Sequence, residues 1–204
     1  MMGDMARPRT FDEAQVVEAS RDLFWNQGYT ATSIDDLSAA TGLGRGSFYK
    51  AFGDKHSMFL RSLQLYCTEA LHGIHAELRN PDLPAYDRLV RHLRAAATSV
   101  ASDSDRRGCL LAKSAAELSS TDPAVAKQVK RTLDGWLREL TATISAAQAD
   151  GDISPDTDPK SLASLLLAVL RGMEALRTGG ASPATIKSAA EQAVALLAVS
   201  APTG

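Results

Sequence analysis

The segment TGLGRGSFYKAFGDKH, residues 41–56, concentrates side chains that can bind a polyanion. Arg45, Lys50 and Lys55 stand there against one acid, Asp54. Guanidinium and ammonium groups bind phosphate oxygens, and an arginine can also donate two parallel hydrogen bonds to guanine. The segment therefore predicts contact with nucleic acid, provided that the surrounding elements hold these side chains on one face.

Capping and turn residues predict the elements around this segment. An apolar face marks a helix over 11–27, which ends at Gly28. Ser33 is expected to cap a second helix that runs to about residue 40. Gly42 supplies a tight turn, and a short third helix follows over 44–52. Two short helices joined in this way form a helix-turn-helix, whose second helix enters the major groove.

The third helix is expected to have an inner and an outer face. Phe48 and Phe52 are four residues apart and should pack against the first two helices. Arg45 and Tyr49 have the same spacing on an adjacent face that points outward. The two glycines beside Arg45 lack a Cβ atom, which allows the backbone to approach a duplex closely. The alternative is a plain helical hairpin with solvated charges.

The rest of the chain also reads as helical, with turn-rich breaks and no alternating strand pattern. Further helices are expected over 55–78, 84–101, 108–118, 122–149, 158–178 and 183–199. We therefore predict an all-α fold of about nine helices in two domains. The three short helices fall within residues 1–54, after an arm over 1–10 that is expected to be flexible, and the remaining helices fall within residues 55–204.

Composition limits the function classes that remain. The chain has 204 residues, 45% of them apolar, and a formal charge of −2, so bulk positive charge cannot explain binding to nucleic acid. Two cysteines provide no disulfide framework, and the first ten residues lack the apolar core of a signal peptide. The longest apolar run, LASLLLAVL at 162–170, is too short to span a bilayer. We expect a cytoplasmic protein that does not bind membranes.

From Phe11 to Leu60 the sequence resembles the tetracycline-repressor (TetR) family of transcriptional regulators. The stretch from Ala19 to Phe59, ASRDLFWNQGYTATSIDDLSAATGLGRGSFYKAFGDKHSMF, carries the resemblance, and GDISPDTDPKSLASLLLAVLRGMEAL resembles the family's penultimate helix. The resemblance implies a three-helix DNA-binding domain over residues 1–54 and a larger helical domain for ligand binding and dimerisation over residues 55–204. It also implies a homodimer through the last two helices, palindromic double-stranded operator DNA, and release by a small-molecule effector. A repressor is the leading expectation.

The resemblance also implies which residues contact DNA. The candidates are Tyr29, Thr32, Ser33, Gly44, Arg45, Gly46, Ser47, Tyr49, Lys50 and Lys55. Arg45 and Lys50 are the candidates for base readout, Lys55 is a phosphate contact, and the two glycines are positions of close backbone approach. Thr32 and Ser33 could equally be helix caps, and Tyr49 could belong partly to the core. Arg7 and Arg9, in the arm, could reach the minor groove.

The effector site is less defined. Its candidate lining residues are Phe59, Leu63, Tyr66, Cys109, Leu110 and Trp136, although aromatic side chains in a helical bundle are more often packing. The segment RGCLLAKSAAELSS, 107–120, resembles regulators that sense electrophiles or oxidants through a cysteine, which would be Cys109. The alternative is an ordinary buried thiol, as we expect for Cys67. We expect Gly135 to leave room beside Trp136.

Other function classes have weaker support. An enzyme with Cys109 as nucleophile would need a histidine base, and no histidine is placed by sequence to serve. Glu69, His72 and His75 follow one another at steps of three, but a metal site is not expected, nor is any cofactor. A helical ligand-binding protein without DNA binding remains the alternative of another class, and the basic residues at 45, 50 and 55 speak against it.

Overall fold

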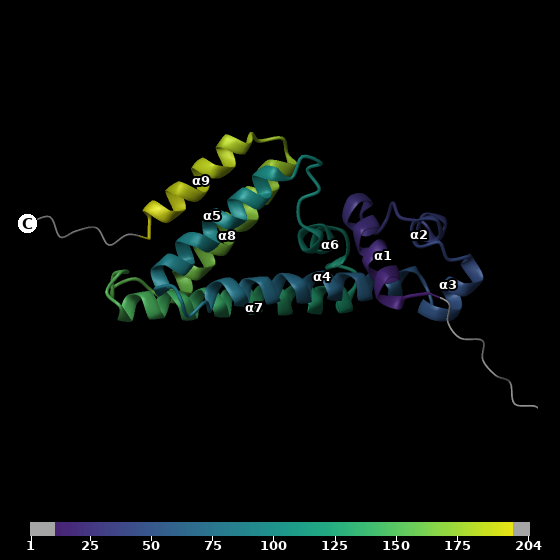
Figure 1. Ribbon diagram of the computed structural model, residues 1–204, viewed down its shortest axis with the longest axis horizontal. Helices are drawn as coiled ribbons and strands as arrows, with labels where there is room; N and C mark the ends of the chain where they lie inside the picture. The colour runs from purple at the N-terminus through teal and green to yellow at the C-terminus, as the bar shows by residue number, and fades with distance from the viewer. Residues whose placement is uncertain (1–10, 198–204) are drawn as a thin grey trace, which may run out of the picture. The chain divides into compact units, whose positions relative to one another are not determined.

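The computed structural model describes residues 11–197, and every regular element in that range is an α-helix. The helices are α1 (Glu13–Gln27), α2 (Ile34–Thr41), α3 (Arg45–Phe52), α4 (Lys55–Leu78), α5 (Ala85–Ser102), α6 (Leu110–Leu118), α7 (Pro123–Ala149), α8 (Pro159–Thr178) and α9 (Pro183–Ala195) (Figure 1). The predicted all-α fold is confirmed. The last helix, α9, ends at Ala195, before the end of its expected range of 183–199, of which 198 and 199 lie outside the described residues. The predicted arm, with Arg7 and Arg9, lies outside the described residues.

Local capping chemistry explains where α1, α2, α7, α8 and α9 begin. The Asp12 carboxylate accepts a hydrogen bond of 2.9 Å from the backbone N–H of Ala14 at the start of α1. The helices α7, α8 and α9 each begin with proline directly after a capping Asp or Ser. Proline suits this position because the first N–H of a helix has no partner within the helix. These signals are local, so the sequence specifies the helix starts strongly.

The chain divides into two compact units, Met1–Tyr66 and Cys67–Gly204. The division falls inside α4, so this helix contributes residues to both units. Our predicted domain boundary at 54/55 instead follows the end of the third helix, and it stays a prediction.

Aromatic packing holds the first unit together. Phe24 of α1 packs edge-on against Phe59 of α4, with ring centroids 5.1 Å apart. Phe48 and Phe52 of α3 are 5.6 Å apart and both are buried, as predicted. Burying a phenylalanine contributes roughly 1.5–3 kcal/mol. The third helix is therefore fixed in the unit by one face, which leaves its other face for function.

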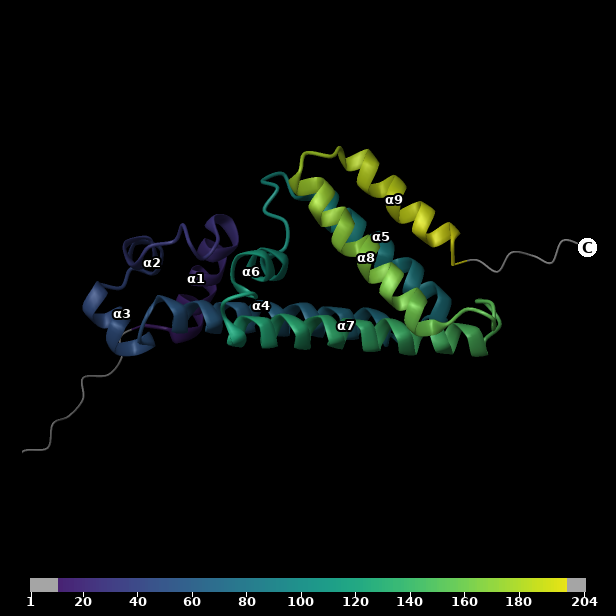
Figure 2. The same ribbon diagram turned by 180° about the vertical axis from the view of Figure 1, so that it is seen from behind.

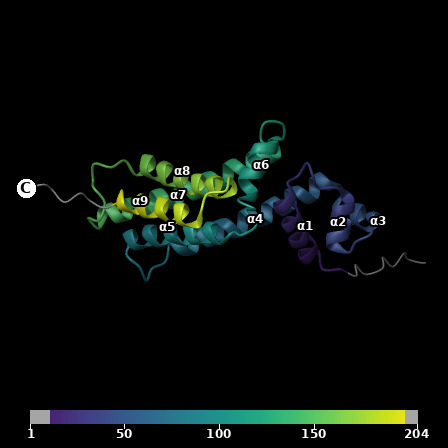
Figure 3. The ribbon, with the colours of Figure 1, turned by 90° about the horizontal axis from the view of Figure 1, so that it is seen from above.

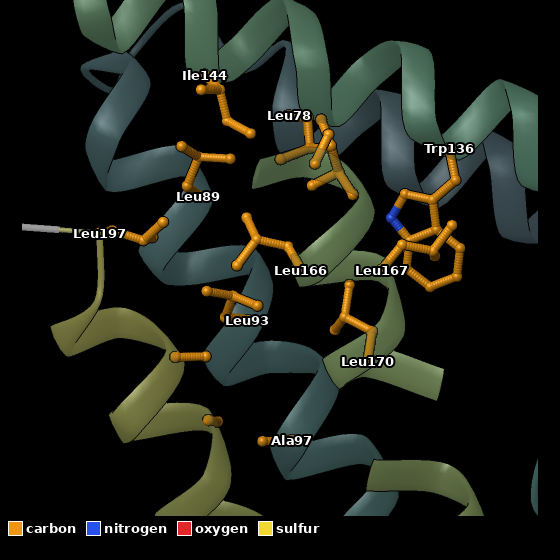
Figure 4. Close-up of a cluster of buried hydrophobic side chains, with 14 of the residues drawn as sticks. Leu78, Leu89, Leu93, Ala97, Trp136, Ile144, Leu166, Leu167, Leu170 and Leu197 are labelled. Carbon is orange, nitrogen blue, oxygen red and sulfur yellow. The ribbon is translucent and has the colours of Figure 1, made fainter. Parts of the chain in front are cut away.

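The second unit is a helical bundle with a leucine-rich core. In it α5 packs against α7, α8 and α9, as Figures 1 and 3 show from two directions. Leucines from these helices, among them Leu89, Leu93, Leu166 and Leu170, point toward one another in the core (Figure 4). Within residues 11–197 no helix combines the length and the apolarity that crossing a membrane requires.

The end of α4 belongs to this second unit and runs beside α7 (Figure 2). The Thr143 hydroxyl donates to the Leu78 carbonyl, and Arg79 makes a two-pronged ion pair with the buried carboxylate of Glu139. The pKa of Glu139 is held below its ordinary value, first by the hydrogen bonds from Arg79 and also by the charge of His75. This ion pair links the loop after α4 to the middle of α7.

Candidate nucleic-acid interface

A tight left-handed turn joins α2 to α3. Gly42 adopts φ 69° and ψ 8°, a conformation that glycine reaches without steric cost. Gly44 then takes the cap position of α3 with an ordinary φ of −64°. Because Phe48 and Phe52 are buried on the inner face, the opposite face of α3 is directed away from the unit's core. The helix-turn-helix predicted from sequence is present.

The outer face of α3 carries the predicted polar and basic side chains. Ser47 and Lys50 are exposed, Tyr49 is 50% exposed, and the Arg45 side chain is 66% exposed. Outside the buried phenylalanine face, α3 thus presents a guanidinium, an ammonium and two hydroxyls within eight residues. These donor groups can bind phosphate oxygens and the edges of bases.

The glycines at 44 and 46 are not explained by packing inside the protein. A Cβ atom added to either would meet no atom within 4 Å, and neither residue has a positive φ. Alanine would therefore fit the unit at both positions, and it would favour the helix at Gly46. The small size of these residues points instead to something outside the unit that approaches the start of α3.

Arg45 is held by a carboxylate of α2, that of Asp35. Arg45 Nε donates to Asp35 Oδ1 at 2.6 Å, and Arg45 Nη2 donates to Asp35 Oδ2, so the pair is bidentate. The hydrogen bonds from Arg45 to Asp35, and then their charge attraction, raise the pKa of Arg45. The pair joins the first turn of α2 to the first turn of α3.

The neighbouring Asp36 has a different task. It closes a capping box with Ser33: the Ser33 hydroxyl accepts from the Asp36 N–H at 3.1 Å, and Asp36 accepts from the Ser33 N–H at 2.8 Å. Hydrogen bonds from Ser33 lower the pKa of Asp36. Ser33 is exposed, so its capping role and the predicted DNA contact are compatible in space.

Three other predicted DNA-contact residues, Tyr29, Thr32 and Lys55, lie in contact within the first unit. The Thr32 hydroxyl is buried and donates to the Gly28 carbonyl at 2.7 Å. Lys55 Nζ donates to the carbonyls of Tyr29 at 3.1 Å and Thr32 at 2.9 Å, and lies 4.2 Å from the centre of the Tyr29 ring. Lys55 thus holds the connection between α1 and α2, and its predicted phosphate contact stays a prediction.

The predicted effector-site residues divide between the two units. Phe59 and Leu63 are buried in the first unit, where Tyr66 packs edge-on against Trp25 at 5.1 Å. Cys109, Leu110 and Trp136 are buried in the second unit. A single pocket lined by all six stays a prediction. The room expected beside Trp136 is absent, because a Cβ atom on Gly135 would lie 2.9 Å from Leu71.

Cys109 contacts charged partners from α8. Its Sγ accepts a hydrogen bond from Arg171 Nη1 at 3.1 Å, and Arg171 also pairs with Glu174 at 2.7 Å. Burial raises the pKa of Glu174, while the Arg171 charge and a hydrogen bond with Cys109 act in the opposite direction. The Arg171 guanidinium stacks 4.5 Å from the centre of the Trp136 ring. The only sign of Arg171 and Glu174 in the sequence is a pair of charges about one turn apart in a helix that is otherwise largely apolar.

A hydrogen-bonded chain continues from Trp136 to α4. The Trp136 indole N–H donates to His92 Nε2 at 3.1 Å, and His92 Nδ1 lies 2.6 Å from Glu77. Because an indole nitrogen can only donate, Nε2 is the acceptor and the ring proton of His92 faces Glu77. No pattern in the sequence indicated these hydrogen bonds between Trp136, His92 and Glu77.

Glu69, His72 and His75, which follow one another at steps of three, all lie in α4. His75 Nε2 lies 3.2 Å from Glu139. Over residues 11–197 no group of three His, Cys, Asp or Glu side chains is placed to hold an ion.

Comparisons with known proteins agree with this geometry. Residues 16–61 match the family model described as bacterial regulatory proteins, tetR family, and residues 85–193 match the one described as tetracyclin repressor-like, C-terminal domain. The HTH-type transcriptional repressor ComR of Escherichia coli K12 is 29% identical, over 86% of this chain and 84% of its own. The repressor DhaR of Mycobacterium sp. strain GP1 is 27% identical, over 80% and 81%.

Solved structures show the same fold. The TetR family regulator CifR, as a cysteine mutant complexed with 26 bp of double-strand operator DNA, superposes with a TM-score of 0.81 at 26% identity. The match covers 94% of this chain and 100% of that one. The reduced form of Escherichia coli NemR has a TM-score of 0.82 at 16% identity, covers 93% of this chain and 98% of that one, and shows the fold alone.

A capped α2, a left-handed turn and an outward-facing α3, followed by a helical bundle, define a helix-turn-helix DNA-binding regulator of transcription. With both of its family models matched, the chain belongs to the TetR family.

Proposed function

We propose that this protein is a dimeric repressor that binds a palindromic operator through α3 and leaves it when a small-molecule effector binds in the second unit. The observation that carries the proposal is the outer face of α3, where Arg45, Tyr49 and Lys50 are exposed beside two glycines with open space around them. The relatives ComR and DhaR are named as transcriptional repressors, which supports repression over activation. A cytoplasmic location follows from this role.

The α3 face supplies both kinds of contact that operator recognition needs. Arg45 has donors for a guanine edge, and Lys50 with Ser47 can meet phosphates or a further base. The open glycines let the backbone at the start of α3 come close to the duplex, where helix N–H groups favour a phosphate. The helix carries one basic patch, so binding will depend on salt.

An exposed apolar stripe on the last two helices supports dimerisation. Leu165 and Leu176 of α8 are 48% and 50% exposed, and Leu196, just after α9, is 72% exposed. Between the two leucines of α8, Ala168 is exposed and Gly172 leaves open space at its Cβ position. Small residues between larger ones suit close helix packing. A two-fold pairing would set the two α3 helices at half-sites about 34 Å apart.

The experiment is a selection of duplexes from a random pool with the purified protein, followed by a gel shift on the enriched sequence. We expect an inverted repeat and tight binding by the wild type. Arg45→Ala with Lys50→Ala should abolish the shift without altering dimerisation. The matched control, Lys127→Ala with Arg131→Ala on exposed sites of α7, removes the same charge and should bind normally. Equal binding by both double variants would place the DNA-binding surface outside α3. Failure of the wild type to enrich any duplex would favour the alternative, a helical ligand-binding protein without DNA binding.

A second mode of release is favoured by the contacts of Cys109. Arg171 can stabilise a thiolate at Sγ, and Glu174 hydrogen-bonds the thiol and could take its proton. Addition to an electron-poor alkene would form one S–C bond. The alkene electron pair would shift to the neighbouring carbon, which then receives the proton released by the thiol. Cys109 is buried, so the reagent would need a local opening.

N-ethylmaleimide tests this alternative on the protein bound to its selected operator. Release that coincides with one adduct in the intact mass, and that Cys109→Ser prevents, would support it. Cys67→Ser is the matched control, because it removes the other buried thiol, whose pKa is raised by burial, and this variant should still be released. Equal release of the Cys109→Ser protein would leave the non-covalent effector as the mode of release.

A further inference from the structure

We infer that Asp35 is a positioning residue for operator reading: it holds the Arg45 guanidinium so that its free edge faces one guanine. The inference rests on the proposed function and adds to it a residue of α2 that the predicted contact set omits. Three observations support it: the way in which the two side chains pair, their exposure, and their place on two different helices.

The pairing uses one edge of the guanidinium and leaves another available. Arginine has five N–H donors, one on Nε and two on each terminal nitrogen. Asp35 accepts from Nε and from Nη2, which is the side edge of the group. The end edge, with one N–H from each terminal nitrogen, keeps two parallel donors. Two parallel donors are what guanine O6 and N7 accept in the major groove.

Both side chains of this ion pair are largely exposed, so the pair contributes little to the stability of the fold. The Arg45 and Asp35 side chains are 66% and 64% exposed, and exposed ion pairs contribute little to stability. An acid beside a DNA-facing arginine also repels phosphate, which is unfavourable for binding in general. The presence of Asp35 is explained if the benefit of fixing one Arg45 rotamer before DNA binds is larger than the cost of the negative charge.

The two residues come from elements that a rigid turn holds together. Asp35 lies in the first turn of α2 and Arg45 is the first residue of α3, ten positions later. The Ser33–Asp36 capping box fixes one end, and the buried Phe48 fixes the other. Among the residues that the structure describes, Asp35 is the acceptor seen for Arg45. The guanidinium is therefore held from α2 while it projects from α3.

The test measures which base pair is read, beyond the affinity itself. The duplex selected by the wild-type protein is compared with copies in which each guanine is replaced singly, and with an unrelated duplex, at fixed ionic strength. For Asp35→Asn we expect the discrimination at one guanine position to fall about tenfold, the scale of one bidentate base contact. Arg45→Ala should lose discrimination at that same position, and the double variant should lose no more.

Glu18→Gln provides the matched control, since it removes one exposed acid of the same unit far from Arg45 in sequence. It should leave the discrimination profile unchanged. The inference is overturned if Asp35→Asn strengthens binding to all duplexes equally, because Asp35 would then act as a repelling charge only. It is also overturned if Asp35→Asn changes discrimination at a position that Arg45→Ala does not affect. Failure of the wild type to enrich any duplex would instead contradict the proposed function.

Discussion

The ammonium nitrogen of Lys55 lies 2.9 Å from the carbonyl oxygen of Thr32, which places the first residue of α4 against the segment that leads into α2. We predict that Lys55→Met loosens this segment, because it removes two charge-assisted hydrogen bonds worth about 1.5–3 kcal/mol each at most. Amide hydrogen exchange of peptides covering residues 28–36 should become faster. The exposed Lys50, changed to Met, is the control and should leave exchange unaltered. Unaltered exchange in Lys55→Met together with weaker operator binding would assign Lys55 to phosphate contact alone.

Gly46→Ala should stabilise the protein and at the same time weaken its binding to the operator. Gly46 lies within α3, and the added Cβ atom meets no other atom within 4 Å. The free energy of unfolding, measured in urea, should therefore rise by about 0.5–1 kcal/mol. Operator affinity should nevertheless fall, because the methyl group occupies the space that the duplex needs. Gly73→Ala in α4, equally unobstructed, is the matched control and should stabilise without affecting the gel shift. Operator binding that survives Gly46→Ala would show that α3 keeps its distance from the duplex at this point.

The Arg79–Glu139 ion pair predicts an acid-sensitive stability. Because Arg79 holds the pKa of Glu139 below its ordinary value, the folded state binds a proton here less readily than the unfolded chain. This contribution is fully present above the unfolded pKa and is lost as the pH falls through the lower folded pKa. Glu139→Gln should reduce the free energy of unfolding at pH 7 by about 1–3 kcal/mol and flatten its decline on acidification. Urea titrations between neutral and acidic pH measure both, and parallel curves for wild type and variant would contradict the assignment.

Leu165→Glu should weaken the proposed dimer. The two-fold operation would bring two copies of the new carboxylate to the same interface, which costs desolvation and repulsion. We expect the dimer dissociation constant to rise about 100-fold, equivalent to nearly 3 kcal/mol, and operator binding to fall with it. Light scattering coupled to size exclusion reports the mass. Ala142→Glu, on an exposed site of α7, should remain dimeric. A Leu165→Glu protein that elutes as a dimer would place the interface elsewhere.

The features that could be predicted from the sequence are those that depend on residues close together in the chain. The Ser33–Asp36 box, Gly42 at a positive φ, and the phenylalanine pair of α3 each act within a few residues, so the helix-turn-helix follows from the sequence. The Asp35 contact of Arg45 depends on the angle between two helices, which no local pattern encodes. The Arg171 contact of Cys109 spans 62 residues and depends on how the bundle packs. Residues that act through distant partners were therefore the ones that sequence reasoning missed.

The stacking of Arg171 on Trp136 gives the second unit a built-in optical reporter. Indole fluorescence responds to a cation lying on the ring, so a molecule that draws the guanidinium away will alter the emission of this tryptophan. With Trp25 replaced by phenylalanine, Trp136 is the sole indole of the chain. Libraries of small molecules can then be screened in a plate reader without any DNA, label or known promoter.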